Sequence, residues 1–328
     1  MKTDLSAEII QHIARGFSYS RILLTGVELD IFTLLAEHSL SAAEIVDRLN
    51  SDLRATTIFL DALVAMDLLT KESGNYRTDP ALVPLLTAES EGSILPGLMH
   101  TAHLWQTWSQ LTDIVVDGGP ASRPDTGSEN RTKAFIGAMH VSALRNAPEL
   151  VRAIDPGPAR NLIDVGGGSG SYTIGFLRAV PGMRATLFDL PEVIPMARER
   201  LADEGLADRV DLVPGDYNGN NLPGGHDLAL LSAIVHQNSH EQNVALYKNI
   251  YGALEPGGRI IVRDYAMSRD RTQPSSGALF AINMLVNTEG GNSYTFDEIK
   301  GGLEEAGFGK VKLIQDSEMS SLVEGVKP

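Results

Sequence analysis

A chain of 328 residues with 43% hydrophobic content buries a large core and predicts two domains, or one domain with a substantial appendage. Its formal net charge of -15 at pH 7 argues against a nucleic-acid partner, because nucleic-acid affinity depends largely on Lys and Arg contacts with phosphates. The absence of cysteine excludes disulfides, thiolate metal ligands and thiol nucleophiles.

The N-terminal segment predicts neither export nor membrane insertion. The first ten residues carry acids where a secretory signal needs an apolar core. No uncharged run approaches the ~18 residues of a membrane span. We therefore expect a cytoplasmic protein.

The first hundred residues are typical of a small, mainly helical module. Apolar residues recur at helical spacing over residues 17–35, and Ser41 with Glu44 forms a capping box for a helix that ends near residue 49. A third helix is predicted over residues 53–68, followed by two short strands around a Gly-Asn turn within residues 69–79. Helix, turn, helix and β-wing together predict a winged helix.

The third helix of this module would read DNA if the winged helix were a DNA-binding domain. It offers Arg54, but otherwise Asp61, Asp67 and a run of apolar residues. No basic face suited to the major groove is present. A winged-helix regulator with a ligand-sensing second domain is therefore kept only as an alternative hypothesis.

The second half of the chain alternates strands and helices. After a predicted helix over residues 104–116 and a loop rich in Gly, Pro, Ser and Asp over residues 117–130, the alternation begins at residue 159. This order predicts a doubly wound parallel α/β sheet. Ligands bind such sheets at the carboxyl ends of the strands. The predicted strands cover residues 161–165, 184–189, 210–213 and 227–235.

The first of these strands runs into a glycine-rich turn. Gly166, Gly168 and Gly170 allow positive φ and a close backbone approach to a ligand. The spacing differs from the dinucleotide fingerprint, and the turn contains no lysine, which excludes a P-loop. Asp164, two residues before the turn, suits a ligand with positive charge, such as the ammonium and sulfonium of S-adenosylmethionine.

The next two strands also end at polar groups. Asp189 follows Asp164 by about 25 residues, close to the spacing at which a second-strand carboxylate receives ribose hydroxyls. After the third strand, Asp216 can accept from an adenine amino group and Tyr217 can cover the ring. A nucleoside-containing ligand is therefore expected.

At this point the chain resembles the class I S-adenosylmethionine-dependent methyltransferases, and specifically the small-molecule O-methyltransferases related to caffeate, acetylserotonin and bacterial polyketide enzymes. The resemblance implies an N-terminal winged-helix dimerisation domain over residues 1–100 and a Rossmann-like seven-stranded catalytic domain with a helical substrate lid over residues 101–328. It also implies a homodimer that methylates a hydroxyl, phenolic by expectation, of a small natural-product-like substrate. The motifs that carry it lie at residues 164–170, 188–193, 215–216 and 256–262.

The same resemblance assigns site residues. His236, just after the fourth strand, corresponds to the family's general base, and an imidazole with an ordinary pKa near 6.5 can accept a proton at neutral pH. Ser232 stands four residues earlier, where the family often has a cation. The expected cofactor-binding residues are Asp164, Gly166, Gly168, Asp189, Leu190, Asp216, Tyr217 and Ser232, and the expected substrate-binding residues are Phe135, Met139, Asn283 and Asn287.

Departures from the family pattern surround the base. Gln237 and Asn238 replace the Asp-Trp that commonly follows the histidine, and Ser293 replaces the glutamate that orients it. Glu289 and Asn283 lie nearby in the sequence and could substitute for that glutamate. A base without its carboxylate partner loses orientation, so an enzyme that uses bound S-adenosylmethionine for a pericyclic, decarboxylating or hydroxylating step is a second alternative.

A metal site is not expected. His236 and His240 have the i, i+4 spacing of a metal pair, but no third ligand clusters with them.

Overall fold

The computed structural model describes residues 5–88, 90, 92–119, 136–137, 143, 146–219, 221–317 and 320–328. The chain divides into two compact units. The first contains the residues up to Gln106 together with Ile136 and Gly137, and the second begins at Thr107. Within the described ranges, no helix has both the length and the apolar character needed to cross a bilayer.

The first unit packs short helices around a small wing. The predicted helix over residues 17–35 was wrong in extent, because the helix begins at Ala7 and stops at Glu28, and Asp30 takes a left-handed conformation (φ 52°) before a further short helix. The capping box of Ser41 and Glu44 is confirmed. The helices are α1 (Ala7–Glu28), α2 (Ile31–Leu34), α3 (Ala42–Leu49), α4 (Leu53–Ala65), α5 (Val83–Leu86) and α6 (Leu95–Trp108), whose last two residues belong to the second unit.

The wing is an antiparallel three-stranded sheet in the order β1-β3-β2. Its strands are β1 (Leu40–Ser41), β2 (Leu69–Glu72) and β3 (Asn75–Thr78). Phe32, Ile45, Leu60 and Tyr76 are almost completely buried between the wing and the helices. The first unit therefore has an apolar core of its own.

One face of α1 remains apolar and exposed. Ile10, Ile13 and Phe17 follow one another at three- and four-residue spacing, so their side chains lie along one side of the helix. They are 55%, 67% and 60% exposed. This stripe, residues 10, 13 and 17, is not covered by the described part of the chain.

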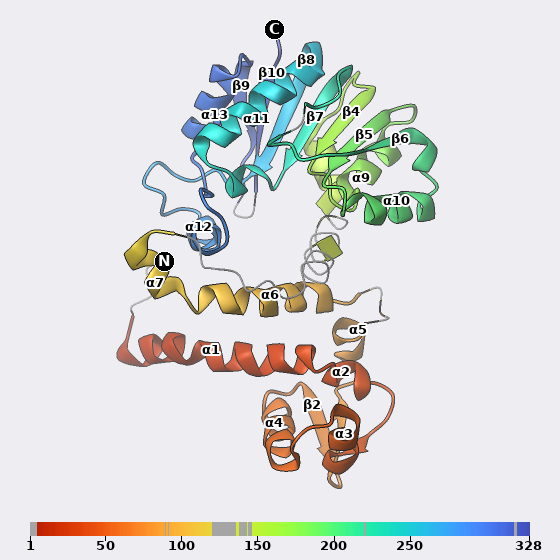
Figure 1. Cartoon of the computed structure of the whole chain (residues 1–328), viewed down its shortest axis with the longest axis vertical. Coiled ribbons are helices and arrows are strands. Elements are labelled where there is room, and N and C mark those ends of the chain that lie inside the picture. The colour runs from red at the N-terminus through yellow and green to blue at the C-terminus, as the bar shows by residue number, and fades with distance from the viewer. Residues whose placement is uncertain are drawn as a thin grey trace. The chain divides into compact units, whose positions relative to one another are not determined.

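The second unit is built on a seven-stranded sheet in the order β6-β5-β4-β7-β8-β10-β9 (Figure 1). The first five strands in that order pair in parallel, whereas β10 runs antiparallel to both of its neighbours. This is the doubly wound α/β fold that the alternating pattern predicts. The strands are β4 (Asn161–Val165), β5 (Arg184–Asp189), β6 (Val210–Pro214), β7 (His226–Ser232), β8 (Leu254–Asp264), β9 (Gly309–Gln315) and β10 (Ser321–Val326).

Helices cover both faces of the sheet because its central strands are apolar on both sides. Ile163 and Val262 belong to the core beneath α11 and α13, whereas Leu162 and Ile261 belong to the core beneath α9 and α10. The remaining helices of the second unit are α7 (Leu111–Asp117), α9 (Ser171–Ala179), α10 (Ile194–Asp203), α11 (His240–Ala253), α12 (Ser275–Asn287) and α13 (Phe296–Glu305). The helix predicted over residues 104–116 was wrong, since α6 and α7 are separate.

The strand predicted over residues 227–235 is also shorter than expected. It ends at Ser232 because Ala233 adopts a left-handed conformation (φ 58°), in which its amide donates to the carbonyl of Arg263 on the neighbouring strand. The residues Val235–Gln237 then form a 3-10 turn before α11 begins. This turn carries His236 at the carboxyl edge of the sheet.

Candidate active site

The glycine turn after β4 packs too tightly for any other residue. Gly166 has φ 71°, and a Cβ at this position would lie 2.5 Å from the Ile234 side chain. A Cβ at Gly167 would lie 2.8 Å from Leu187 and 3.0 Å from the Asp164 carboxyl carbon. Glycine at these two positions therefore lets the turn pack directly against Ile234, Leu187 and Asp164.

Asp164 lies beneath this turn and is only 2% exposed. Its Oδ2 accepts a hydrogen bond of 2.7 Å from the Thr173 hydroxyl at the start of α9. Burial, with a smaller contribution from the nearby carboxylate of Asp189, raises the pKa of Asp164 to about 6, although the Thr173 hydrogen bond lowers it in part. A cationic ligand above the turn would favour the ionised carboxylate.

Asp189, at the end of β5, ties the turn to the neighbouring strand. Its Oδ2 accepts from the Gly168 amide and its Oδ1 accepts from the Leu190 amide, both at 2.7 Å. Burial raises the pKa of this carboxyl, and the two backbone hydrogen bonds lower it in part. Each carboxylate oxygen has more than one acceptor position, so both can also receive ribose hydroxyls.

Tyr217 and Asp216 follow β6 on the other side of Asp189. Asp216 is exposed, and its Oδ1 accepts from the Asn218 amide at 2.8 Å. Tyr217 is half-buried beside the glycine turn, and burial, followed by the charges of Asp216 and Asp189, raises its pKa to about 12. The phenol therefore stays neutral and offers a flat apolar face. The structure brings the predicted residues of β4, β5 and β6 to one edge.

His236 is held by a carboxylate that the sequence did not identify. Its Nδ1 lies 2.9 Å and 3.0 Å from the two carboxylate oxygens of Asp264, at the end of β8. The His236 amide also donates to Asp264 Oδ2, at 3.2 Å. The imidazole is 8% exposed and Asp264 is 7% exposed. The two side chains form a buried pair where β7 and β8 end side by side.

Asn283, one of the two residues suggested as a substitute for the missing glutamate, has other contacts. Asn283 Oδ1 accepts from the indole of Trp108 and from the Asn287 amide group, each at 3.0 Å. Asn287 Oδ1 accepts from Thr107 at 2.9 Å. Within the described part of the chain, neither asparagine contacts His236 by a hydrogen bond, and Glu289 forms none with it either. The residue that contacts the imidazole is Asp264, and neither of the two residues considered from the sequence forms a hydrogen bond with it.

Two of the residues that depart from the family pattern, Gln237 and Asn238, support the turn that carries the histidine, and the third, Ser293, contacts α12. Gln237 Nε2 donates to the carbonyl of Ala233 at 3.1 Å, and Asn238 Nδ2 donates to Asn243 at 3.1 Å. Ser293 is buried and donates to the carbonyl of Gly277 at 2.8 Å. Their side chains stabilise backbone segments rather than face the imidazole.

An aromatic side chain that the sequence did not single out adjoins the histidine. The ring of Phe280, on α12, meets His236 edge to face with 4.8 Å between ring centroids, and the centroid of the Tyr265 ring lies 5.2 Å from that of Phe280. The helical spacing of α12 alone could not distinguish this contact from core packing. Phe135 and Met139, the other expected substrate contacts, lie outside the described residues.

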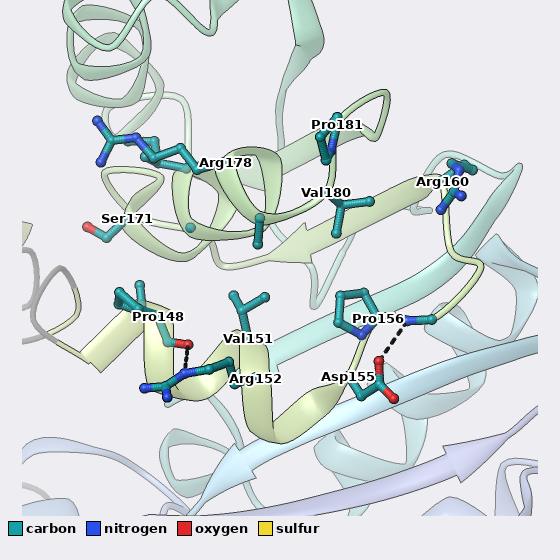
Figure 2. Close-up of a pocket in the computed structure, with 15 residues that line it drawn as sticks. Pro148, Val151, Arg152, Asp155, Pro156, Arg160, Ser171, Arg178, Val180 and Pro181 are labelled. Carbon is teal, nitrogen blue, oxygen red and sulfur yellow. Dashed lines mark hydrogen bonds between the residues drawn. The ribbon is translucent and has the colours of Figure 1, made fainter.

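A cavity of about 810 Å³ lies away from these groups (Figure 2). It is bounded by the helical residues 147–151, by Pro156 and by one side of α9 from Ser171 to Ala179, and its lining is mostly apolar. Arg152 donates to the carbonyl of Pro148 and Arg178 pairs with Glu204. None of the predicted site residues lines this cavity, so it is not the site of the chemistry.

The fold and this edge define a class I S-adenosylmethionine-dependent methyltransferase. The glycine turn provides a side-chain-free backbone, and the acids and Tyr217 provide acceptors and an aromatic face for a cationic nucleoside. The chain belongs to the O-methyltransferase family: residues 110–309 match the O-methyltransferase domain, and residues 11–85 match the O-methyltransferase dimerisation domain.

The individual proteins to which this chain is similar are also methyltransferases. The chain is 30% identical to the 3-hydroxy-5-methyl-1-naphthoate 3-O-methyltransferase of Streptomyces sahachiroi, over 97% of this chain and 95% of the relative. It is 32% identical to the tetracenomycin polyketide synthesis 8-O-methyl transferase TcmO of Streptomyces glaucescens, over 97% and 96%. Human N-acetylserotonin methyltransferase in complex with S-adenosylmethionine has a TM-score of 0.82 at 26% identity, covering 100% of this chain and 99% of that chain. The protein is an S-adenosylmethionine-dependent O-methyltransferase of the polyketide and acetylserotonin type.

Proposed function

We propose that the protein methylates a phenolic hydroxyl of a small aromatic substrate, with His236 as the general base. The observation that carries this proposal is the buried contact between His236 and Asp264 at the carboxyl edge, beside the glycine turn. S-adenosylmethionine supplies an electrophilic methyl group on its sulfonium. Gly166, Gly168, Asp189, Asp216 and Tyr217 would hold it.

The contact with Asp264 determines which nitrogen of the base is free. An ionised carboxylate only accepts hydrogen bonds, so the proton of the neutral imidazole resides on Nδ1. Nε2 then presents its lone pair and takes the proton of the substrate hydroxyl as the oxygen attacks. Asp264 is a positioning residue in this scheme, because it orients the ring and stabilises the imidazolium that forms.

A phenol fits these groups better than an aliphatic alcohol. A phenolic hydroxyl has a pKa near 10, much closer to that of an imidazole than the value of about 16 typical of water. Phe280 and Tyr265 add an aromatic surface next to the base. The named substrates of two relatives, a naphthoate and a tetracenomycin intermediate, are consistent with an aromatic acceptor.

The test compares His236→Ala with the matched control His240→Ala, which removes an exposed histidine at the start of α11. With a weakly acidic phenol, His236→Ala should lower kcat by ~10²-fold or more, the usual contribution of general-base catalysis. S-adenosylhomocysteine affinity, measured by calorimetry, should change little. The defect should shrink with nitrophenols, which are already ionised near neutral pH.

Full turnover of His236→Ala with a weakly acidic phenol would refute the base assignment. If the wild-type protein binds S-adenosylmethionine but releases no S-adenosylhomocysteine with any phenol of a broad panel, the phenolic acceptor is wrong and the non-methylating alternative gains support.

We further propose that the protein acts as a homodimer through its first unit. The match to the dimerisation domain and the exposed apolar stripe at residues 10, 13 and 17 support this assembly. An apolar face of this kind on a soluble module is commonly a protein contact.

A further inference from the structure

Arg263, the penultimate residue of β8, has no function in the scheme above. Its guanidinium lies 3.4 Å from the Ser232 hydroxyl on the adjacent strand and 5.4 Å from the centroid of the Tyr172 ring on α9. Its contacts within the described residues include no ion pair. A half-buried cation without an ion-pair partner among the described residues can bind an anion strongly.

The pleat of β8 separates this cation from the acid next to it. Ile261 and Arg263 share a face of the sheet with Leu230 and Ser232 of β7, and that face packs under α9. Asp264 points to the opposite face, where it binds His236. Arg263 is therefore not neutralised by its neighbour in the sequence.

The position of Arg263 along the edge indicates which anion it meets. In the strand order β6-β5-β4-β7-β8, the polar groups are Asp216 and Tyr217, then Asp189, then the glycine turn, then Ser232, then Arg263. S-adenosylmethionine presents its groups in the same sequence: adenine, ribose, sulfonium and ammonium, carboxylate. The carboxylate is the only anionic group of this cofactor.

We propose that Arg263 binds the carboxylate of the methionine moiety of S-adenosylmethionine, with Tyr172 holding the guanidinium in place. The Tyr172 hydroxyl adjoins Ser232, Arg263 and Asp164, and burial raises its pKa, so it remains a neutral donor. The acids bind the cationic and nucleoside parts, and Arg263 recognises the one negative charge at the end of the molecule. This assignment does not depend on the role of His236.

The test compares two ligands that differ only in the carboxylate. The dissociation constants of S-adenosylhomocysteine and of its decarboxylated amine analogue are measured by calorimetry for the wild-type protein, Arg263→Met and Arg263→Lys. Arg263→Met should lose affinity for S-adenosylhomocysteine by roughly 10- to 100-fold, the usual contribution of a charge-assisted hydrogen bond. Its affinity for the amine analogue should change less than about twofold, and Arg263→Lys should recover part of the loss.

Arg184→Met is the matched control, because Arg184 is an exposed arginine at the amino end of β5. It should leave both dissociation constants unchanged. Thermal unfolding of each variant checks that the fold is intact. An equal loss of affinity for the two ligands in Arg263→Met would mean that Arg263 only supports the local structure. An unchanged affinity of Arg263→Met for both ligands would also overturn the assignment.

Discussion

Replacing Asp264 by Asn removes one charge from the site and keeps the shape of the side chain. Full charges about 4 Å apart interact by roughly 4 kcal/mol at an effective dielectric constant of 20, which is the scale for an imidazolium facing Asp264. Only part of that charge has developed in the transition state, and the amide oxygen of Asn can still accept a hydrogen bond. We therefore expect Asp264→Asn to raise the barrier by about 2–3 kcal/mol, or to lower kcat roughly 30- to 150-fold.

The measurement is kcat with saturating S-adenosylmethionine and a weakly acidic phenol, together with calorimetry of S-adenosylhomocysteine binding. The affinity should stay within about twofold, because Asp264 points to the sheet face opposite Arg263 and its side chain contacts His236. Since Asp264 acts through His236, the double variant should be no slower than His236→Ala alone. Multiplicative losses in the double variant would refute this reasoning. Asp227→Asn serves as the control, since that carboxylate accepts from the amides of Arg160 and Asn161 at the opposite edge.

Three further predictions concern the cofactor, the assembly and the pH response. Asp189→Ala should weaken S-adenosylmethionine binding by about 1.5–3 kcal/mol, because hydrogen bonds to the ribose are lost; an unchanged dissociation constant in calorimetry would contradict it. Light scattering should give a dimer, and Phe17→Asp should shift it toward monomer; a wild-type monomer at micromolar concentration would disprove the assembly. Burial lowers the pKa of His226 below its ordinary 6.5. The contribution of the neutral His226 to the free energy of unfolding is therefore fully present above about pH 6.5 and is lost as the pH falls below it. Urea unfolding at pH 7.5 and pH 5 should show a smaller acid loss for His226→Gln than for the wild type; equal losses would rule this out.

Part of the sheet could be predicted from the sequence because an apolar run that stops at a polar residue marks the end of a strand. The strand that stops at Asp189 has the bounds expected from its apolar run, since burial on both faces leaves a polar residue only at the edge. The capping box of Ser41 and Glu44 likewise predicts the start of α3 from two local residues. These signals are local, so no knowledge of the tertiary structure was needed.

The partner of His236 could not be predicted in that way. Asp264 is 28 residues further along the chain. His236 and Asp264 meet because β7 and β8 are adjacent parallel strands whose carboxyl ends lie at the same edge of the sheet. The end of β8 carries the same signal as the end of β5, an apolar run that stops at an acid, but a single sequence does not reveal the order of the strands in the sheet. The early end of β7 depends on a positive φ at Ala233. Alanine rarely adopts this conformation, so the sequence gives no signal for it.

The alternation at the end of β8 constrains how this enzyme can change. Arg263 and Asp264 are consecutive residues with opposite charges, and the pleat sends one to each face of the sheet. Inserting or deleting a single residue in this strand would exchange the two faces, leaving a carboxylate beside Tyr172 and a guanidinium beside His236. Length changes should therefore be tolerated in the loops on either side of β8 but not within it, and a library of single-residue insertions should show this strand as a sharp minimum in the surviving activity.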